Sequence, residues 1–339
     1  MKFLIQDCEE DDTMPLLEVK DLSTHYFLRR SRVRAADDIY FTVEKGKMLG
    51  LAGESGCGKT TVALSIIRML PPEGKIIKGE VILNDTNIFD MGPKEVRENR
   101  WKDISYIFQY AMNAFNPVMT VGEQIFEVIV EKSASKSKSI KQEAWEKVKD
   151  LFKIVGLDPE RIKDYPHEFS GGMKQRAVIA MAMACDPKVL IADEPVTALD
   201  VIVEKKIIKL LKDLQKQYDL GIIFITHDLS VIAESCEEVG IMYAGKLVEI
   251  GDASTIFHNS AHPYSKMLIR SFPSILGEKV RITPIYGIPP NLANPPTGCR
   301  FHPRCPLATQ ECKKELPPFE QFSSPRHFVA CHHAGQDLP

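Results

Sequence analysis

The sequence predicts an α/β fold in which helices cover a parallel sheet. Three short apolar runs, residues 48–52, 189–192 and 221–226, have the length and composition of buried strands. Between the last two runs, the apolar residues of segment 207–214 recur with the i, i+3, i+4, i+7 spacing of an amphipathic helix. Buried strands that alternate with amphipathic helices are typical of a parallel sheet, so this fold class is expected.

Two further regions are expected to join this sheet. Residues 14–45 alternate apolar and polar side chains with a period of two, which predicts half-buried strands in an antiparallel β subdomain. The basic segment 29–34 within them is interpreted as a solvent-exposed hairpin tip, with a phosphate or partner contact as the alternative. A helical stripe that follows the polar run 131–139 predicts an inserted helical subdomain over about residues 110–175.

The last part of the chain, residues 256–339, is interpreted as a small appended domain that follows a main domain of residues 14–255. Ten of the 22 prolines lie in residues 285–339, so little regular structure is expected there. Four of the eight cysteines lie in the same stretch, with the spacing C-x5-C-x6-C-x18-C. They are Cys299, Cys305, Cys312 and Cys331. Such clustering in a chain without a secretory signal indicates a metal or cluster site rather than a disulfide framework.

The composition excludes several classes of protein. With 43 basic and 46 acidic residues among 339, the formal net charge is −3, which argues against a nucleic-acid partner. A content of 44% hydrophobic and 26% charged residues is that of a folded globular chain. The longest apolar run, residues 177–185, is far shorter than the roughly 20 residues of a membrane-spanning helix. Residues 1–13 lack the pattern of a secretory signal, so a cytosolic location is expected.

A glycine-rich turn follows the first predicted strand. Residues 53–60 read Gly-Glu-Ser-Gly-Cys-Gly-Lys-Thr and fit the phosphate-loop pattern G-x-x-x-x-G-K-[ST], between a strand and an apolar helix. Glycines allow successive backbone N–H groups to surround a phosphate, and the helix start adds its positive dipole end. We expect Lys59 to bridge the β- and γ-phosphates and the Thr60 hydroxyl to ligate Mg²⁺. The expected nucleotide contacts are Gly53, Ser55, Gly56, Cys57, Gly58, Lys59, Thr60 and Thr61.

Two adjacent acids end the second predicted strand. Residues 188–195 read Lys-Val-Leu-Ile-Ala-Asp-Glu-Pro, an apolar strand followed by Asp193 and Glu194. Alone, this pattern is typical of a solvated strand end. In a chain that also has a phosphate loop, Asp193 is expected to hold Mg²⁺, directly or through water, and Glu194 is expected to polarise the attacking water.

A serine and two glycines, Ser170, Gly171 and Gly172, open the apolar helix that runs to residue 185. Ser170 is a good N-cap, and the start of the helix is a ready anion site. The stretch 169–176, Phe-Ser-Gly-Gly-Met-Lys-Gln-Arg, is similar to the signature loop of the ATP-binding cassette (ABC) ATPases, although Phe and Met replace the commonest Leu and Gln. Residues 15–255 as a whole resemble that family of P-loop NTPases.

The resemblance implies roles for further residues. Gln109 matches the glutamine of the Q-loop, Asp200 matches the D-loop, and His227 matches the switch histidine that contacts the γ-phosphate. Tyr26 matches the aromatic residue that stacks on adenine, with Phe27 as the alternative. The implied cofactors are ATP and Mg²⁺. The implied catalytic residues are Lys59, Gln109, Glu194 and His227, the implied Mg²⁺ ligands are Thr60, Gln109 and Asp193, and Ser170, Gly171, Gly172 and Asp200 complete the nucleotide contacts.

The resemblance also implies an arrangement of subunits. Two cassettes meet head to tail in this family, and each ATP lies between the phosphate loop of one and the signature loop of the other. Within the family the chain is similar to the ATPase subunits of dipeptide and oligopeptide importers, through segments 168–173, 262–265 and 298–306. The implied place is the cytoplasmic face of the cell membrane, as a peripheral motor subunit. The implied partners are a second ABC ATPase subunit, two transmembrane permease subunits and, indirectly, a solute-binding protein.

Other functions are kept as alternatives. The same role in an oligosaccharide or nickel importer, a non-transport ABC ATPase, and a nucleotide-gated module whose tail senses iron or redox state remain open. The tail cysteines also admit two metal centres, because four thiolates suit a tetrahedral zinc ion or a [4Fe–4S] cluster. The importer resemblance implies the cluster, and hence a loop-rich C-terminal iron–sulfur domain. The alternatives are zinc or an empty site, and His302, His332 and His333 are the alternative ligands.

Overall fold

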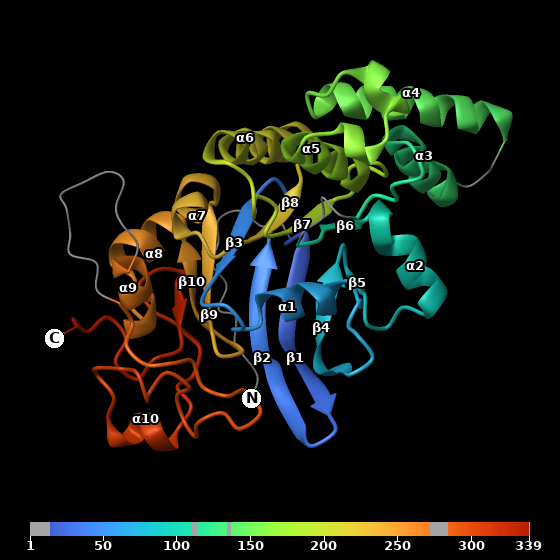
Figure 1. Cartoon of the computed structure of the whole chain (residues 1–339). Helices are drawn as coiled ribbons and strands as arrows, with labels where there is room; N and C mark the ends of the chain where they lie inside the picture. The colour runs from blue at the N-terminus through green and yellow to red at the C-terminus, as the bar shows by residue number, and fades with distance from the viewer. Residues whose placement is uncertain (1–13, 110–113, 134–136, 272–283, 339) are drawn as a thin grey trace.

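The computed structural model describes residues 14–109, 114–133, 137–271 and 284–338 (Figure 1). The N-terminal segment 1–13, whose pattern argued against a secretory signal, lies outside the described residues. So do the first residues of the predicted helical insertion and the middle of the polar run at 131–139.

An eight-stranded sheet forms the centre of the molecule. Its strands are β3 (Met48–Ala52), β6 (Ile104–Ile107), β7 (Val189–Asp193), β8 (Gly221–Ile225), β9 (Glu238–Tyr243), β10 (Lys246–Asp252), β11 (Glu320–Gln321) and β12 (Phe328–Val329). They pair in the order β11-β12-β10-β9-β3-β8-β7-β6, and the five strands from β9 to β6 are parallel. The predicted strands correspond to β3, β7 and β8, so the expected parallel sheet is confirmed.

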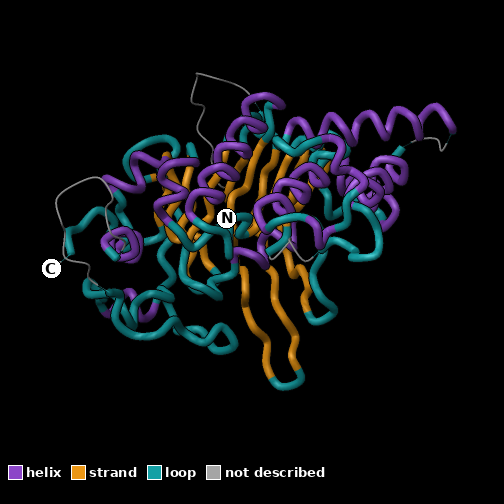
Figure 2. The backbone as a smooth tube through the Cα atoms, turned by 45° about the horizontal axis from the view of Figure 1, so that its top comes forward, coloured by secondary structure: helices purple, strands orange, loops and turns teal. Residues whose placement is uncertain are grey.

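A second, antiparallel sheet of four strands lies against the first. Its strands are β1 (Leu17–Leu28), β2 (Ser31–Val43), β4 (Gly74–Leu83) and β5 (Thr86–Asn87), in the order β2-β1-β4-β5. β1 and β2 form a long hairpin that projects from the molecule (Figure 2). Leu28 pairs with Ser31, so the turn itself consists of Arg29 and Arg30, and residues 27–32 around it are exposed as expected of a hairpin tip. The loop expected over 29–34 was too long, because cross-strand pairing with β1 extends β2 to Ser31.

Helices cover both faces of the main sheet. They are α1 (Lys59–Ile66), α2 (Pro93–Lys102), α3 (Val121–Lys132), α4 (Lys138–Ile154), α5 (Gly171–Ala182), α6 (Val201–Tyr218), α7 (Leu229–Ser235), α8 (Ala253–Asn259), α9 (Pro263–Arg270) and α10 (Gln310–Lys314), with the 3₁₀ turns η2 (Pro159–Lys163) and η3 (Pro166–Glu168). Helix α1 contacts β1 and β2 on one side and β7 on the other, so it lies between the two sheets. Helices α3, α4 and α5 pack on one another as the helical insertion, whose expected limits, about 110 and 175, stay a prediction.

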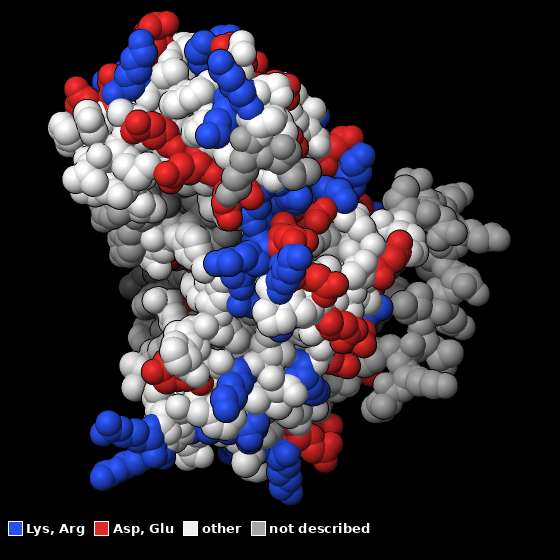
Figure 3. Space-filling model, turned by 90° about the vertical axis from the view of Figure 1, so that its right-hand side faces the viewer, with Lys and Arg blue, Asp and Glu red and all other residues white. Residues whose placement is uncertain are grey.

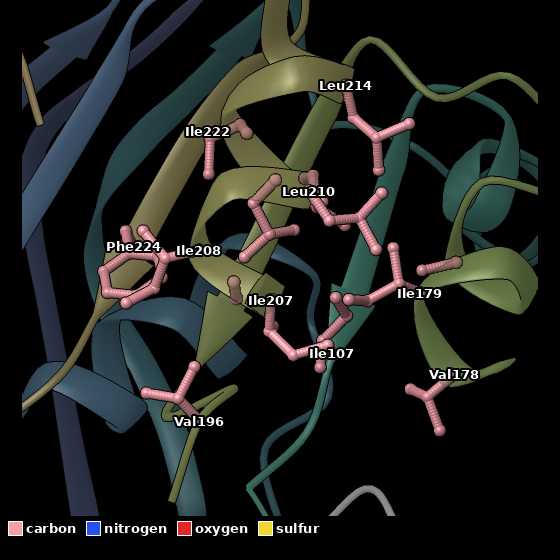
Figure 4. Close-up of a cluster of buried hydrophobic side chains, with 14 of the residues drawn as sticks. Ile107, Val178, Ile179, Val196, Ile207, Ile208, Leu210, Leu214, Ile222 and Phe224 are labelled. Carbon is pink, nitrogen blue, oxygen red and sulfur yellow. The ribbon is translucent and has the colours of Figure 1, made fainter. Parts of the chain in front are cut away.

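The core under α5 and α6 is mainly apolar, with Gln175 and Gln215 as buried polar side chains of the two helices. Figure 4 shows side chains of these two helices directed at the strands β6 and β8, with Ile179 and Ile207 near Ile107, and Leu210 between α6 and the sheet. The i, i+3, i+4, i+7 pattern read from the sequence is therefore the buried face of α6.

The C-terminal region is loop-rich and is attached to the main sheet. β12 pairs antiparallel with β10, and Figure 1 shows the orange-to-red segment beside β9 and β10. Next to this pairing, the buried carboxylate of Glu249 accepts hydrogen bonds from the backbone N–H groups of Ala261 and His262 and lies 2.8 Å from Nε2 of His327. The sheet continues across the predicted division at residue 255, because the tail contributes β11 and β12, the two strands at one edge of the sheet.

Across the described residues, the structure has no helix with both the length and the apolar character needed to span a membrane. The face that carries α2, α3 and α4 mixes basic and acidic side chains with uncharged ones (Figure 3).

The packing of α6 gives a stability prediction. Leu211 is fully buried under α6, so we expect Leu211→Ala to lower the free energy of unfolding by about 2–5 kcal/mol through lost burial and a residual cavity. Urea unfolding of the full chain measures it. Lys209→Ala, on the exposed side of the same helix, is the control and should change stability by less than about 0.5 kcal/mol. Equal effects of the two substitutions would contradict the packing described here.

Candidate functional site

The phosphate loop connects β3 to α1 and is enclosed by two neighbouring backbone segments. Gly53 and Gly58 have positive φ angles of 145° and 111°. A Cβ on Gly53 would lie 2.1 Å from the carbonyl oxygen of Met242, and a Cβ on Gly58 would lie 2.1 Å from that of Ala35. Only glycine fits these two positions, because any side chain would overlap backbone atoms.

Lys59 lies across the loop at the start of α1. Its Nζ donates to the carbonyl oxygen of Gly53 at 2.7 Å and to that of Glu54 at 3.3 Å, and the residue is buried. Cys57 is also buried in the loop, and burial raises the pKa of its thiol. A neutral, enclosed thiol has little nucleophilic or redox reactivity, so the backbone rather than Cys57 gives this loop its chemistry.

A buried carboxylate lies next to the loop at the end of β7. Tyr106 donates from its hydroxyl to Oδ2 of Asp193 at 2.8 Å, and the Thr60 side chain also lies beside this carboxylate. Burial raises the pKa of Asp193, against the lowering effect of these hydrogen-bonding neighbours. Oδ1 of Asp193 is buried and has no hydrogen-bond partner among the described residues. A hard cation beside the Thr60 hydroxyl would satisfy this oxygen, so the donor set fits Mg²⁺.

Gln109 and His227 both lie beside Glu194, the residue that follows Asp193. One oxygen of the Glu194 carboxylate accepts hydrogen bonds from Nε2 of Gln109 and from the hydroxyl of Thr197, each at 2.9 Å. The other oxygen lies 3.4 Å from Nδ1 of His227. Glu194 itself has a left-handed backbone with a φ of 48°, which ends β7. No sequence pattern indicated Tyr106 or Thr197, because only strand pairing and the turn after β7 bring them here.

The signature loop lies at the start of α5, and the D-loop residue Asp200 lies at the start of α6. Ser170 is the N-cap of α5 and accepts from the backbone N–H of Met173 at 3.4 Å. Gly172 packs so closely on α6 that a Cβ there would lie 2.6 Å from the Val203 side chain. Asp200 is the N-cap of α6 and accepts from the N–H groups of Ile202 and Val203. Ser170 and Gly171 are exposed at the helix start, where they are open to another molecule.

Tyr26 and Phe27 are on opposite sides of β1. The Tyr26 hydroxyl lies 3.3 Å from Oγ1 of Thr61 in the first turn of α1, and its ring packs against Gly74. Phe27 is exposed and contacts the cationic groups of Arg32 and Lys75 instead. Of the two aromatic candidates, Tyr26 is therefore the one beside the phosphate loop and its helix.

The four tail cysteines line one cavity together with His302, His332 and His333. Burial raises the pKa of the thiols of Cys305 and Cys331, to about 11 and about 12. Ring nitrogens of the three histidines have partners of their own, the carbonyls of Cys299 and Glu315 and the Thr309 hydroxyl. Within the described residues, no group of three or more His, Cys, Asp or Glu side chains has a geometry that would hold a metal ion. The geometry therefore does not support the expected iron–sulfur cluster or zinc ion. It does place the four thiols around one cavity.

Comparison with known proteins assigns the family. A family model described as "ABC transporter" matches residues 36–197, and one described as "Oligopeptide/dipeptide transporter, C-terminal region" matches residues 248–312. The dipeptide transport ATP-binding protein DppD of Bacillus subtilis is 41% identical over 93% of this chain and 94% of its own length. This chain belongs to the ABC transporter family. The oligopeptide transport ATP-binding protein OppD of Salmonella typhimurium is similar at 43% identity, over 95% of each chain.

Solved structures agree with this assignment. A bacterial ABC transporter cassette solved as a dimer superposes with a TM-score of 0.62 at 25% identity, over 70% of this chain and 98% of the cassette. The resemblance to ABC ATPases and to the dipeptide and oligopeptide group within them is thereby confirmed, and the protein is an ATP-binding subunit with ATPase activity.

The glycines of the phosphate loop give a matched pair of substitutions. Gly58→Ala would force the new Cβ into the Ala35 carbonyl, whereas a Cβ at Gly56 meets no atom within 4 Å. We expect Gly58→Ala to abolish measurable ATP binding. Gly56→Ala should only weaken binding, because its cost is the left-handed backbone alone, about 1–2 kcal/mol. Titration of the full chain with a fluorescent ATP analogue measures both, and equal affinities would contradict the enclosed loop.

Proposed function

We propose that this chain is the ATP-hydrolysing motor subunit of an ABC importer for dipeptides or oligopeptides. The observation that carries the proposal is the meeting of Gln109, Glu194 and His227 beside the buried Asp193, at the ends of three parallel strands next to the phosphate loop. The names of relatives at about 40% identity, and the match of the C-terminal region, support a peptide as the transported solute. Oligosaccharide and nickel uptake are the alternatives that a transport assay would separate.

The residues divide the chemistry among them. Backbone N–H groups of the loop and Lys59 bind the phosphates, Tyr26 stacks on the base, and Glu194 polarises the attacking water. His227 contacts the γ-phosphate. Thr60, Asp193 and Gln109 would hold Mg²⁺, which when bound neutralises charge on the β- and γ-phosphates.

Pairing with a second cassette completes the proposed site. Ser170, Gly171 and Gly172 of one chain would contact the nucleotide held by the loop of the other. Beside the D-loop Asp200, the apolar side chains of Val201 and Ile202 are 67% and 68% exposed, as expected of residues that become covered in a dimer. The second cassette is a copy of this chain or a paralogue.

Two permease subunits are the other proposed partners, reached from the cytoplasmic face of the membrane. Phe108 of the Q-loop, Val118 and Tyr165 are exposed apolar side chains on or next to the helical insertion. Exposed apolar side chains of this size are the proposed contacts that a permease would cover. Closure of the cassette dimer would pull on the permeases through this insertion, and the solute-binding protein would act through the permeases.

The role of Glu194 is tested by one conservative substitution. We expect Glu194→Gln to keep ATP binding and to lower the ATPase rate by about 100-fold or more, because the general base is lost. In gel filtration the variant with ATP should elute as a stable dimer. Glu234→Gln, an exposed acid on α7, is the control and should hydrolyse ATP normally. Near-normal turnover by Glu194→Gln would contradict the assignment.

For the tail, we propose that Cys299, Cys305, Cys312 and Cys331 bind a [4Fe–4S] cluster, with Zn²⁺ as the alternative. The support is the chemistry of the donors: four thiols line one cavity, and four thiolates are the usual ligands of such a cluster. The proposed role is structural, since a loop-rich region of this size gains stability from a metal centre.

Metal analysis of anaerobic and aerobic preparations tests the cluster. We expect about four iron atoms per chain and a broad visible absorbance in anaerobic protein, both lost in Cys312→Ser. Cys185→Ser, a cysteine outside this cavity, is the control and should keep the iron. Stoichiometric zinc without iron would overturn the cluster in favour of zinc.

A further inference from the structure

An arginine in the tail reaches the phosphate loop. The guanidinium of Arg304 forms a two-point ion pair with the carboxylate of Glu54, at 2.6 Å from Nη1 to Oε2 and 3.0 Å from Nη2 to Oε1. Its other N–H groups donate to the Tyr243 hydroxyl and to the carbonyls of Ile285 and Tyr286. The Arg304 side chain is only 5% exposed, so the pair is held in one geometry.

The backbone of Glu54 is held from the same side. Its N–H donates to the hydroxyl of the buried Tyr264 at 3.1 Å, and Tyr264 belongs to α9, in the same C-terminal region. Its carbonyl oxygen accepts from Nζ of Lys59. Arg304, 250 positions along the chain, therefore fixes the side chain of Glu54, and Tyr264, 210 positions along, fixes its N–H. Glu54 in turn helps to fix Lys59.

A second arginine supports the other end of the loop. Arg300 donates to the carboxylate of Asp37 and to the carbonyl of Ala244. The next residue, Gly245, donates its N–H to the Cys57 carbonyl at 2.8 Å and accepts from the N–H of Asp37 at 2.8 Å. The two arginines lie four residues apart in the cysteine-containing segment and contact the loop, or its supporting turn, at separate points.

The charge of Glu54 explains why this contact matters for the nucleotide. Glu54 occupies a position of the loop that wraps the phosphates, and an unpaired carboxylate there would repel a triphosphate. The pair with Arg304 neutralises this carboxylate and holds it on the side of the loop that faces the tail. We propose that Arg304 is a positioning residue for ATP binding, which acts through Glu54 to hold the phosphate loop in shape.

A double-mutant cycle on the full chain tests this proposal. The variants are Arg304→Ala, Glu54→Gln and their combination, titrated with a fluorescent ATP analogue and assayed for ATPase activity. We expect Arg304→Ala to raise the Kd for the analogue about tenfold, with kcat at saturating ATP within about twofold of the parent. The double variant should bind no more weakly than Arg304→Ala, because the unpaired carboxylate is gone.

The control separates positioning from general stabilisation of the tail. Arg326 also joins the tail to the core, through Glu44 and Glu238, but it does not contact the phosphate loop. Arg326→Ala should therefore leave the Kd unchanged, even where it lowers the unfolding temperature. The proposal is overturned if Arg304→Ala binds the analogue as tightly as the parent, or if both arginine variants lose the same affinity.

The loop side of the ion pair can be changed as well, and iron can be measured in the same samples. If Arg304→Ala fails to fold, Glu54→Gln removes the ionic character and the two-point geometry of the pair from the loop side, and Glu54 does not line the cysteine cavity. A raised Kd in that variant supports the proposal, and an unchanged Kd overturns it. Iron measured in the same samples distinguishes this outcome from the cluster proposal, because Glu54→Gln should change affinity with no change in metal content.

Discussion

The nucleotide site depends on how closely two backbone carbonyls approach the phosphate loop. The oxygens of Met242 and Ala35 lie 2.1 Å from where the Cβ atoms of Gly53 and Gly58 would be, so the loop is confined between β2 and the end of β9. This confinement fixes the start of α1 and with it Lys59 and Thr60. Asp193 and Glu194, at the end of β7, therefore face phosphates whose position is constant, because the confined loop cannot move toward these acids.

Several polar groups surround the carboxylate of Glu194. Glu194 is approached by an amide, a hydroxyl and an imidazole from three segments, after β6, after β7 and after β8. The Thr197 contact is local, because Thr197 lies three residues after Glu194 in the same turn. The contacts of Gln109 and His227 are long-range. They exist because parallel strands deliver their carboxyl ends to one edge, where residues distant in sequence become neighbours.

The sequence predicted the central strands and the principal site residues because both have strong local patterns. Continuous apolar runs mark β3, β7 and β8, and the glycine-rich loop needs a specific residue at each position. The partners of those residues could not be predicted, since Tyr106 and Arg304 reach the site only through strand register and tertiary packing, and Thr197 only through the conformation of the turn after β7. The hairpin of β1 and β2 was expected, but the length of its loop was overestimated for a related reason. Its basic composition suggested a loop, but pairing along the strand extends β2.

The short strand β12 has a consequence for the order in which the molecule is completed. Residues near the end of the chain close the edge of β10 and supply the histidine that neighbours the buried Glu249. During synthesis the earlier residues emerge first, so this edge and this buried acid stay open until residues 327–329 have left the ribosome. An interrupted translation product would present an unpaired strand to its neighbours, and clearance or chaperoning of such fragments becomes part of making this subunit.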